Sequence, residues 1–155
     1  MIGIIDYNMG NLASVYNACK LIDADATIVK NPEDLKKFNR VILPGVGAYK
    51  DAMEHLIQTG MNEAVYEFAK TGKPMIGICL GMQLLFESSQ EFGHSDGLGL
   101  IDGHVIKFDK SKMHEDFKIP HMGWNTIKNK ENPLFEGLKD PYLYFVHSFH
   151  AKTKE

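Results

Sequence analysis

The sequence has few cysteines, little net charge and no long apolar run. Cys19 and Cys79 are the only cysteines among 155 residues, which excludes a disulfide scaffold. The formal net charge of -3 comes from interspersed charges, so no nucleic-acid surface or membrane-binding face is indicated. No stretch reaches the roughly 18 apolar residues of a membrane span, and the start lacks a secretory signal pattern. These absences favour a cytoplasmic protein.

Ligand spacings typical of metal sites are also missing. Neither H-x-x-x-H nor C-x-x-C occurs, so we expect no metal and no cofactor. The pair Gly72-Lys73 has no following Ser or Thr and no glycine five residues earlier, which excludes a phosphate-binding loop.

The chain has the composition of an ordinary globule, with 44% hydrophobic and 24% charged residues, and we expect one domain over residues 1–155. Short apolar runs at Ile2–Ile5, Ala26–Val29 and Val41–Leu43 alternate with helical stretches. This alternation predicts an α/β fold in three layers, with a doubly wound, mostly parallel sheet. Ligands of such sheets bind beyond the carboxyl ends of the strands.

The most informative stretch runs from Pro74 to Glu87. An apolar run ends at Cys79 and predicts a strand buried on both faces, and glycines stand two residues before and two after the cysteine. This spacing is typical of a nucleophile on a strained strand-to-helix turn. The dipole of the helix favours a thiolate there, and the N–H of Leu80 is placed to bind an oxyanion. The alternative is that Cys79 is a small buried hydrophobe at a strand end.

Two further patterns bear on this turn. Met82, Leu85 and Phe86 recur at the spacing of one helix face, so we expect the helix to continue through them. Pro44–Tyr49 follows the third strand and carries two glycines, which either form a plain tight turn or supply the second oxyanion donor.

Five segments in order carry a resemblance to a known family: PGVGAY, GICLGMQLLFE, DGLGLIDG, PHMGWN and YFVHSFHA. Over essentially the whole chain they resemble the class I glutamine amidotransferases. Within that class, IIDYNMGNL and HMGWN are most similar to the glutaminase subunits of imidazole glycerol phosphate synthases. The resemblance implies that Cys79 attacks the side-chain amide of glutamine, which yields a glutamyl thioester and ammonia.

The resemblance also implies the roles of other residues. The oxyanion donors are the N–H of Leu80 and a peptide N–H of the loop, at Val46 or Gly45. Substrate-binding residues follow from the same motifs: Gly47, Gln83, Ser148 and Phe149. The histidine and glutamate of the family's triad lie in an H-P-E-K-S type motif, which is not present in this chain, so we expect a C-terminal part to be missing and the chain alone to be inactive.

The family resemblance implies a partner as well. In that family the ammonia passes to a (β/α)8 barrel cyclase that makes imidazole glycerol phosphate and AICAR. The surface expected to border this partner consists of His121, Met122, Trp124, Asn125 and Tyr144. Three alternatives stay open: a homologous subunit that feeds ammonia to an amidine-forming sugar synthase, a docking subunit without catalysis, and a different cysteine hydrolase or redox-sensing protein of the same architecture.

Overall fold

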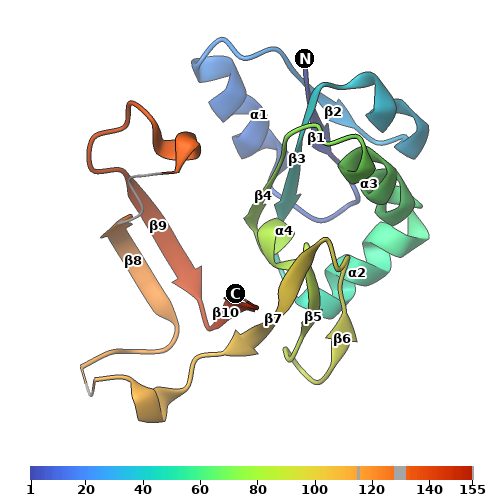
Figure 1. The fold of residues 1–155 in the computed structure, drawn as a ribbon. Coiled ribbons are helices and arrows are strands. Elements are labelled where there is room, and N and C mark those ends of the chain that lie inside the picture. The colour runs from blue at the N-terminus through green and yellow to red at the C-terminus, as the bar shows by residue number, and fades with distance from the viewer. Residues whose placement is uncertain (115, 128–131, 155) are drawn as a thin grey trace. The chain divides into compact units, whose positions relative to one another are not determined.

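The computed structural model describes residues 1–114, 116–127 and 132–154, which form two compact units. The first unit contains residues 1–106 and the end of the chain from Ala151. The second unit contains residues 107–150. Figure 1 shows the elements of both units coloured along the chain. No helix among the described residues is long and apolar enough to cross a membrane.

A parallel sheet of four strands forms the centre of the first unit. Its strands are β1 (Ile2–Ile5), β2 (Ala26–Val29), β3 (Arg40–Gly45) and β4 (Met75–Cys79). Their order in the sheet is β2-β1-β3-β4, and every neighbouring pair is parallel. The predicted α/β class is therefore confirmed, and the apolar runs predicted as strands lie in β1 to β4.

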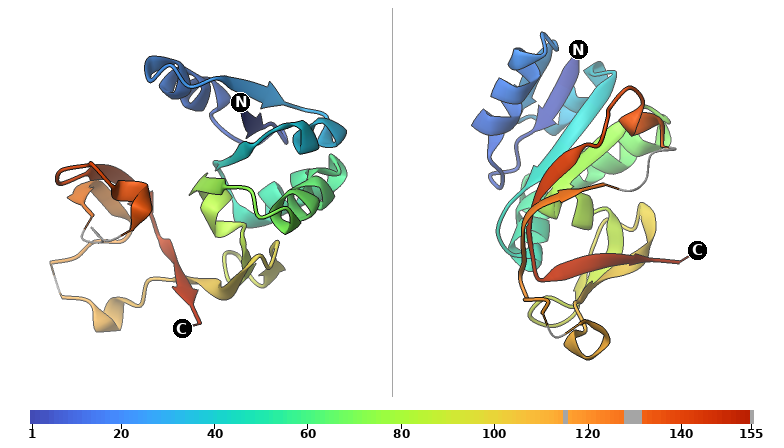
Figure 2. Two further views of the ribbon diagram at one scale, coloured as in Figure 1. Left: turned by 45° about the horizontal axis from the view of Figure 1, so that its top comes forward. Right: turned by 90° about the vertical axis from the view of Figure 1, so that its left-hand side faces the viewer.

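Helices cover both faces of this sheet. Helix α1 (Leu12–Leu21) lies on one face, and η1 (Pro32–Lys37), α2 (Tyr49–Gln58) and α3 (Met61–Lys70) lie on the other (Figures 1 and 2). Right-handed crossovers between parallel strands place the helices in this way. The Asn11 side chain accepts a hydrogen bond from the Ser14 N–H at 3.1 Å and caps α1.

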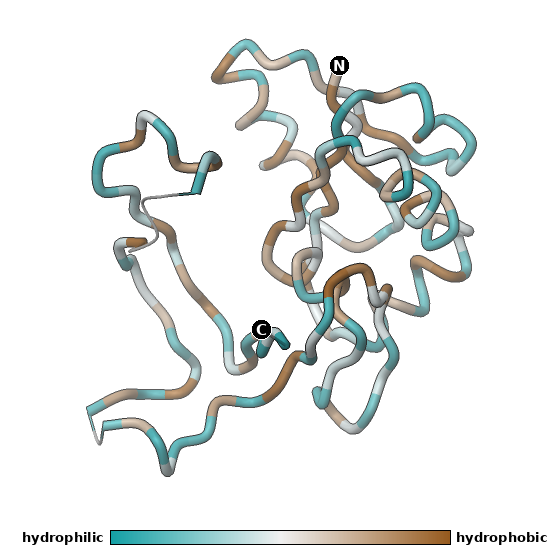
Figure 3. Tube along the Cα trace, in the orientation of Figure 1, coloured by the Kyte–Doolittle hydropathy of each residue, from teal (hydrophilic) through white to brown (hydrophobic). Residues whose placement is uncertain are grey.

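The core of the first unit lies between the sheet and the helices α2 and α3. Ile5 of β1 and Val29 of β2 are register partners, and both they and Leu43 of β3 are at most 4% exposed. Full burial of such side chains contributes about 1.5–3 kcal/mol each. Figure 3 shows apolar residues along these strands and hydrophilic ones in many of the connections.

The prediction that the strand before Cys79 is buried on both faces is wrong. Ile76 and Ile78 are each 40% exposed. The reason is topological, because β4 is an edge strand of this sheet among the described residues and α1 lies over the opposite end of the face. An apolar run indicates a strand but does not distinguish a central strand from an edge strand.

The predicted helix through Met82, Leu85 and Phe86 is also wrong beyond its first turn. Helix α4 (Leu80–Gln83) is only four residues long, and Phe86 begins strand β5 (Phe86–Ser89). Strand β5 pairs in parallel with β7 (Ile101–Lys107), and these backbone hydrogen bonds replace those of a longer helix. Three apolar residues at helical spacing are too few to decide between the two structures.

The remaining strands form a second sheet of four strands and a pair of strands. In the first unit, β6 (Ser95–Asp96) and the end of β10 (Phe149–Thr153) complete a sheet of order β10-β7-β5-β6. In the second unit, β8 (His121–Thr126) and β9 (Tyr142–His147) form an antiparallel pair. The 3-10 turns η2 (Lys110–Lys112) and η3 (Pro133–Phe135) lie in the same unit.

Candidate functional site

The turn at the end of β4 has the strained geometry that the sequence predicts. Cys79 is the last residue of β4 and the N-cap of α4, with φ 55° and ψ −119°. A residue other than glycine in such a conformation costs about 1–3 kcal/mol and is concentrated at functional sites. The thiol is free and exposed, so the alternative of a buried hydrophobe is wrong.

Glycines on both sides allow the turn to press against β3. A Cβ atom on Gly81 would lie 2.8 Å from the carbonyl carbon of Leu43. A Cβ on Gly77 would lie 2.8 Å from the carbonyl carbon of Gly81, so this residue too must lack a side chain. These separations are below any normal carbon contact, and the two glycines are therefore sterically required rather than merely permissive.

The glycine-rich segment that begins at the end of β3 lies directly beside the cysteine. Gly45 is the register partner of Cys79 in the pairing of β3 with β4. A Cβ on Gly45 would lie 2.9 Å from the carbonyl carbon of Leu80. Val46 is half exposed and Gly47 has φ +92°. The structure thus brings together the turn at Cys79, which we call the elbow, and the loop that sequence analysis named as the second source of oxyanion donors.

Two of the other predicted residues lie in α4. Leu80, whose peptide N–H is the predicted donor, is 4% exposed and begins the helix. Gln83 ends the same turn and is half buried. Because α4 has one turn only, its dipole is weaker than that of the longer helix we expected, and the local N–H groups become the main electrostatic contribution.

Tyr7 is a residue of this site that sequence analysis missed. It is fully buried, and its hydroxyl donates a hydrogen bond of 2.9 Å to the carbonyl oxygen of Pro44. Burial, followed by the charge of Cys79, raises the pKa of Tyr7 far above the usual value for a tyrosine. The partners are 37 positions apart, and no local motif announces such a contact.

Glu91 is the second missed residue. Its Oε2 atom accepts a hydrogen bond of 2.7 Å from the N–H of Tyr49, the first residue of α2. A carboxylate at this position satisfies one of the N–H groups that a helix leaves free at its start and interacts favourably with the helix dipole. Glu91 therefore fixes the point where the glycine-rich loop enters α2.

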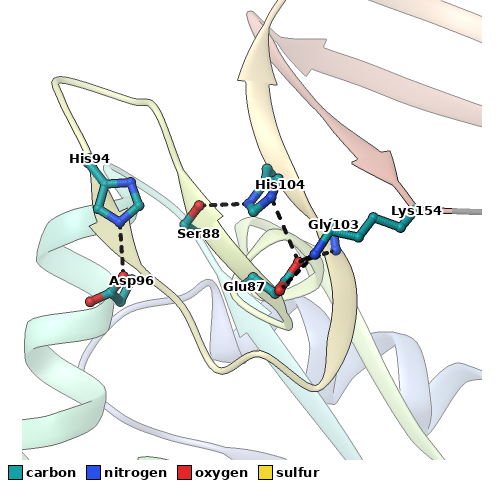
Figure 4. Close-up of polar contacts among 7 residues, drawn as sticks. All are labelled: Glu87, Ser88, His94, Asp96, Gly103, His104 and Lys154. Atoms are coloured by element: carbon teal, nitrogen blue, oxygen red, sulfur yellow. Dashed lines mark hydrogen bonds and ion pairs between the residues drawn. The ribbon is translucent and has the colours of Figure 1, made fainter.

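A polar cluster around Glu87 fastens the strands that follow the elbow (Figure 4). Its carboxylate accepts hydrogen bonds from Gly103 N–H at 2.8 Å and from Lys154 Nζ at 3.0 Å. The bond from Lys154 and then that from Gly103 lower the pKa of Glu87. His104 Nδ1 lies 2.9 Å from Ser88 Oγ. The cluster links β5, β7 and the residues after β10.

The remaining predicted residues lie in or beside the β8–β9 pair of the second unit. Strand β8 carries His121, Met122, Trp124 and Asn125, strand β9 carries Tyr144, and Ser148 and Phe149 follow β9. Trp124 is 69% exposed and its ring meets that of Tyr144 edge-on, with centroids 5.5 Å apart. The pair thus presents exposed aromatic rings.

A chain of hydrogen bonds orders the polar side chains of this pair. His147 Nδ1 donates to the carbonyl oxygen of Phe149 at 2.7 Å, so Nε2 of a neutral His147 accepts from His121 Nδ1 at 3.1 Å. His121 Nε2 then accepts from the amide of Asn125 at 2.9 Å. The contacts thereby define one tautomer for each ring. Among the described residues, no group of three or more His, Cys, Asp or Glu is arranged to hold a metal ion.

The elbow, its thiol and the glycine-rich loop are the features of a cysteine-dependent acyl-transfer site. Comparison with known families agrees, because the model of the family "Glutamine amidotransferase class-I" matches residues 3–155. The chain belongs to the class I glutamine amidotransferases.

Two curated relatives show which subunits within this class the chain is similar to. The chain is 60% identical, over 99% of its length and 76% of the relative's, to "Imidazole glycerol phosphate synthase subunit HisH" of Wolinella succinogenes. It is 61% identical, over 97% of its length and 73% of the relative's, to the protein of that name from Sulfurimonas denitrificans. A solved structure described as a glutamine amidotransferase superposes with a TM-score of 0.71 at 18% identity, over 94% of this chain and 70% of the other, which supports the fold.

Proposed function

We propose that this chain is the glutaminase subunit of an imidazole glycerol phosphate synthase, with Cys79 as the nucleophile. The observation that carries the proposal is the exposed thiol at a strained turn, held by required glycines beside the Gly45 backbone. The membership of the chain in the amidotransferase class and its similarity to HisH subunits supply the substrate, glutamine, and the pathway, histidine biosynthesis.

The chemistry is an acyl transfer through a thioester. The sulfur of Cys79 attacks the carbonyl carbon of the glutamine side-chain amide, and the negative charge moves to the oxygen. We assign the N–H groups of Leu80 and of Val46 or Gly45 as donors to that oxyanion. When the tetrahedral species collapses, the C–N bond breaks and the proton lost by the thiol leaves with the nitrogen as ammonia. Water then adds to the thioester, releases glutamate and restores the thiol.

We assign Gln83 on α4 and the backbone of Gly47 to substrate recognition. The family resemblance adds Ser148 and Phe149, which follow β9. The histidine base of the family resemblance lies in a motif that these 155 residues do not contain.

The proposed partner is a (β/α)8 barrel cyclase that receives the ammonia. The exposed rings of Trp124 and Tyr144 are of the residue types that dominate binding energy at interfaces. We expect Trp124→Ala to weaken binding to the cyclase at least about tenfold. Phe117→Ala, at another exposed aromatic position outside the β8–β9 pair, is the matched control. Equal effects of both variants would argue against this surface.

A cytoplasmic location completes the proposal. Both cysteines are unpaired thiols, which is the form that a reducing compartment maintains.

The decisive test of the function is glutamine hydrolysis by the complete protein with its cyclase partner. Cys79→Ala removes the activity, and Cys19→Ala, at the buried cysteine of α1, leaves it in place. Activity that survives Cys79→Ala would reject the mechanism.

A further inference from the structure

The segment from Pro44, near the end of β3, to Tyr49, the first residue of α2, is called the oxyanion loop here and is held at both ends by side chains from distant parts of the chain. At its start, the Tyr7 hydroxyl donates to the carbonyl oxygen of Pro44 at 2.9 Å. At its end, the Glu91 carboxylate accepts from the N–H of Tyr49 at 2.7 Å. The peptide units between these two fixed points are those assigned to oxyanion binding.

The Tyr7 hydroxyl donates to a backbone carbonyl oxygen, that of Pro44, which lies beyond the pairing of β1 with β3. Strand β1 pairs with β3 only as far as Ile4 and Ile42, and the Pro44 carbonyl lies two residues beyond the last pair. The phenol supplies a donor where β1 has already turned away. Because a peptide unit is planar, fixing the oxygen of Pro44 also fixes the orientation of the unit that leads into Gly45, the neighbour of Cys79.

The turn after β1 is built to hold Tyr7 in this position. Asp6, which is buried, accepts a hydrogen bond from the Asn8 N–H at 3.0 Å and closes a tight turn around Tyr7. Gly10 packs on Pro44, since a Cβ there would lie 3.2 Å from the proline ring. The turn and the oxyanion loop are therefore in contact through two residues of the turn, Tyr7 and Gly10.

We propose that Tyr7 is a positioning residue for glutamine hydrolysis, which holds the Pro44 end of the oxyanion loop beside Cys79. The inference rests on the proposed function and adds a residue to it. Tyr7 acts through the Pro44 carbonyl and not on substrate. The hydroxyl is deeply buried and stays protonated, so it remains a donor throughout the neutral pH range.

The test is Tyr7→Phe in the complete protein with its cyclase partner. This substitution removes one oxygen atom and leaves the ring. We expect kcat for glutamine hydrolysis to fall about tenfold, because a displaced oxyanion donor weakens the transition state more than the ground state. We expect KM to change less than twofold. The matched control is Tyr66→Phe, which removes another phenol-to-carbonyl bond, that to Leu98, and leaves kcat unchanged.

A second measurement separates positioning from general disruption. Alkylation of Cys79 by iodoacetamide needs the thiol but forms no oxyanion, so its rate in Tyr7→Phe stays within twofold of the wild type. A parallel loss of alkylation and kcat, or an unchanged kcat, would overturn the proposal. If the wild-type protein itself hydrolyses no glutamine, the failure lies with the proposed function rather than with Tyr7.

Discussion

Replacing Gly81 by alanine tests the close approach of the elbow to β3. The new Cβ would lie 2.8 Å from the carbonyl carbon of Leu43 and 2.9 Å from that of Pro44. Carbon atoms in ordinary contact are about 3.5 Å apart, and the carbonyl oxygen of Leu43 would lie closer to the new Cβ than either carbon, so the backbone must move by more than about 0.7 Å. These obstacles are main-chain atoms of a hydrogen-bonded strand and cannot rotate away. We therefore expect a loss of about 3 kcal/mol in the free energy of unfolding, the upper end for overpacking.

The matched control is Gly72→Ala. Gly72 has φ +69° with no atom within 4 Å of an added Cβ, so alanine there pays only the left-handed strain of about 1–2 kcal/mol. Urea unfolding followed by circular dichroism gives both free energies, and a glutaminase assay at a temperature where both variants are folded gives activity. A displaced oxyanion site lowers kcat of Gly81→Ala by about 100-fold. If Gly81→Ala costs no more than Gly72→Ala and keeps its activity, the packing argument is refuted.

Three further predictions concern strain and charge. Cys79→Gly is more stable to urea than Cys79→Ala by about 1 kcal/mol, because glycine adopts φ 55° without strain; the reverse order would contradict a strained elbow. Burial raises the pKa of Tyr7 and Tyr49, so the unfolded chain ionises first and the free energy of unfolding falls above about pH 10; a flat alkaline limb would be the contrary result. Hydrogen bonds, first that from Lys154, lower the pKa of Glu87, so the ionised carboxylate stabilises the fold and this stabilisation is lost as the pH falls below about 4.3. We therefore expect Glu87→Gln to make the melting temperature less sensitive to acid. An unchanged dependence on acid pH would count against the cluster.

The parallel sheet could be predicted because its strands are continuous apolar runs. Ile2–Ile5 and Ala26–Val29 match β1 and β2 at both ends, and Cys79 ends β4 as predicted. The length of α4 could not be predicted, because the pairing of Phe86–Ser89 with β7 replaces helical hydrogen bonds that the local pattern allows equally well.

The candidate site was predicted only in its local part. The Gly-x-Cys-x-Gly spacing around Cys79 is contiguous in sequence and could be recognised. Tyr7 and Glu91 reach their partners over 37 and 42 positions. Such contacts depend on the order of the strands and on the exits of the loops, which spacing does not encode.

The exposure of β4 shows the same limit. An apolar strand can have the same sequence pattern at the centre or at the edge of a sheet. Ile76 and Ile78 lie on β4, an edge strand of the described sheet. What the sequence could give was the direction of the strand and the residue at its end. Those two facts were sufficient to locate the thiol.

The most direct test of Cys79 as the glutamine nucleophile is covalent labelling of the complete protein by a diazo-ketone analogue of glutamine. After digestion, mass spectrometry identifies the modified cysteine. The proposed chemistry predicts one adduct per chain, on Cys79, formed in step with the loss of glutaminase activity and slowed by excess glutamine. An adduct on Cys19, or inactivation that leaves Cys79 unmodified, would contradict it.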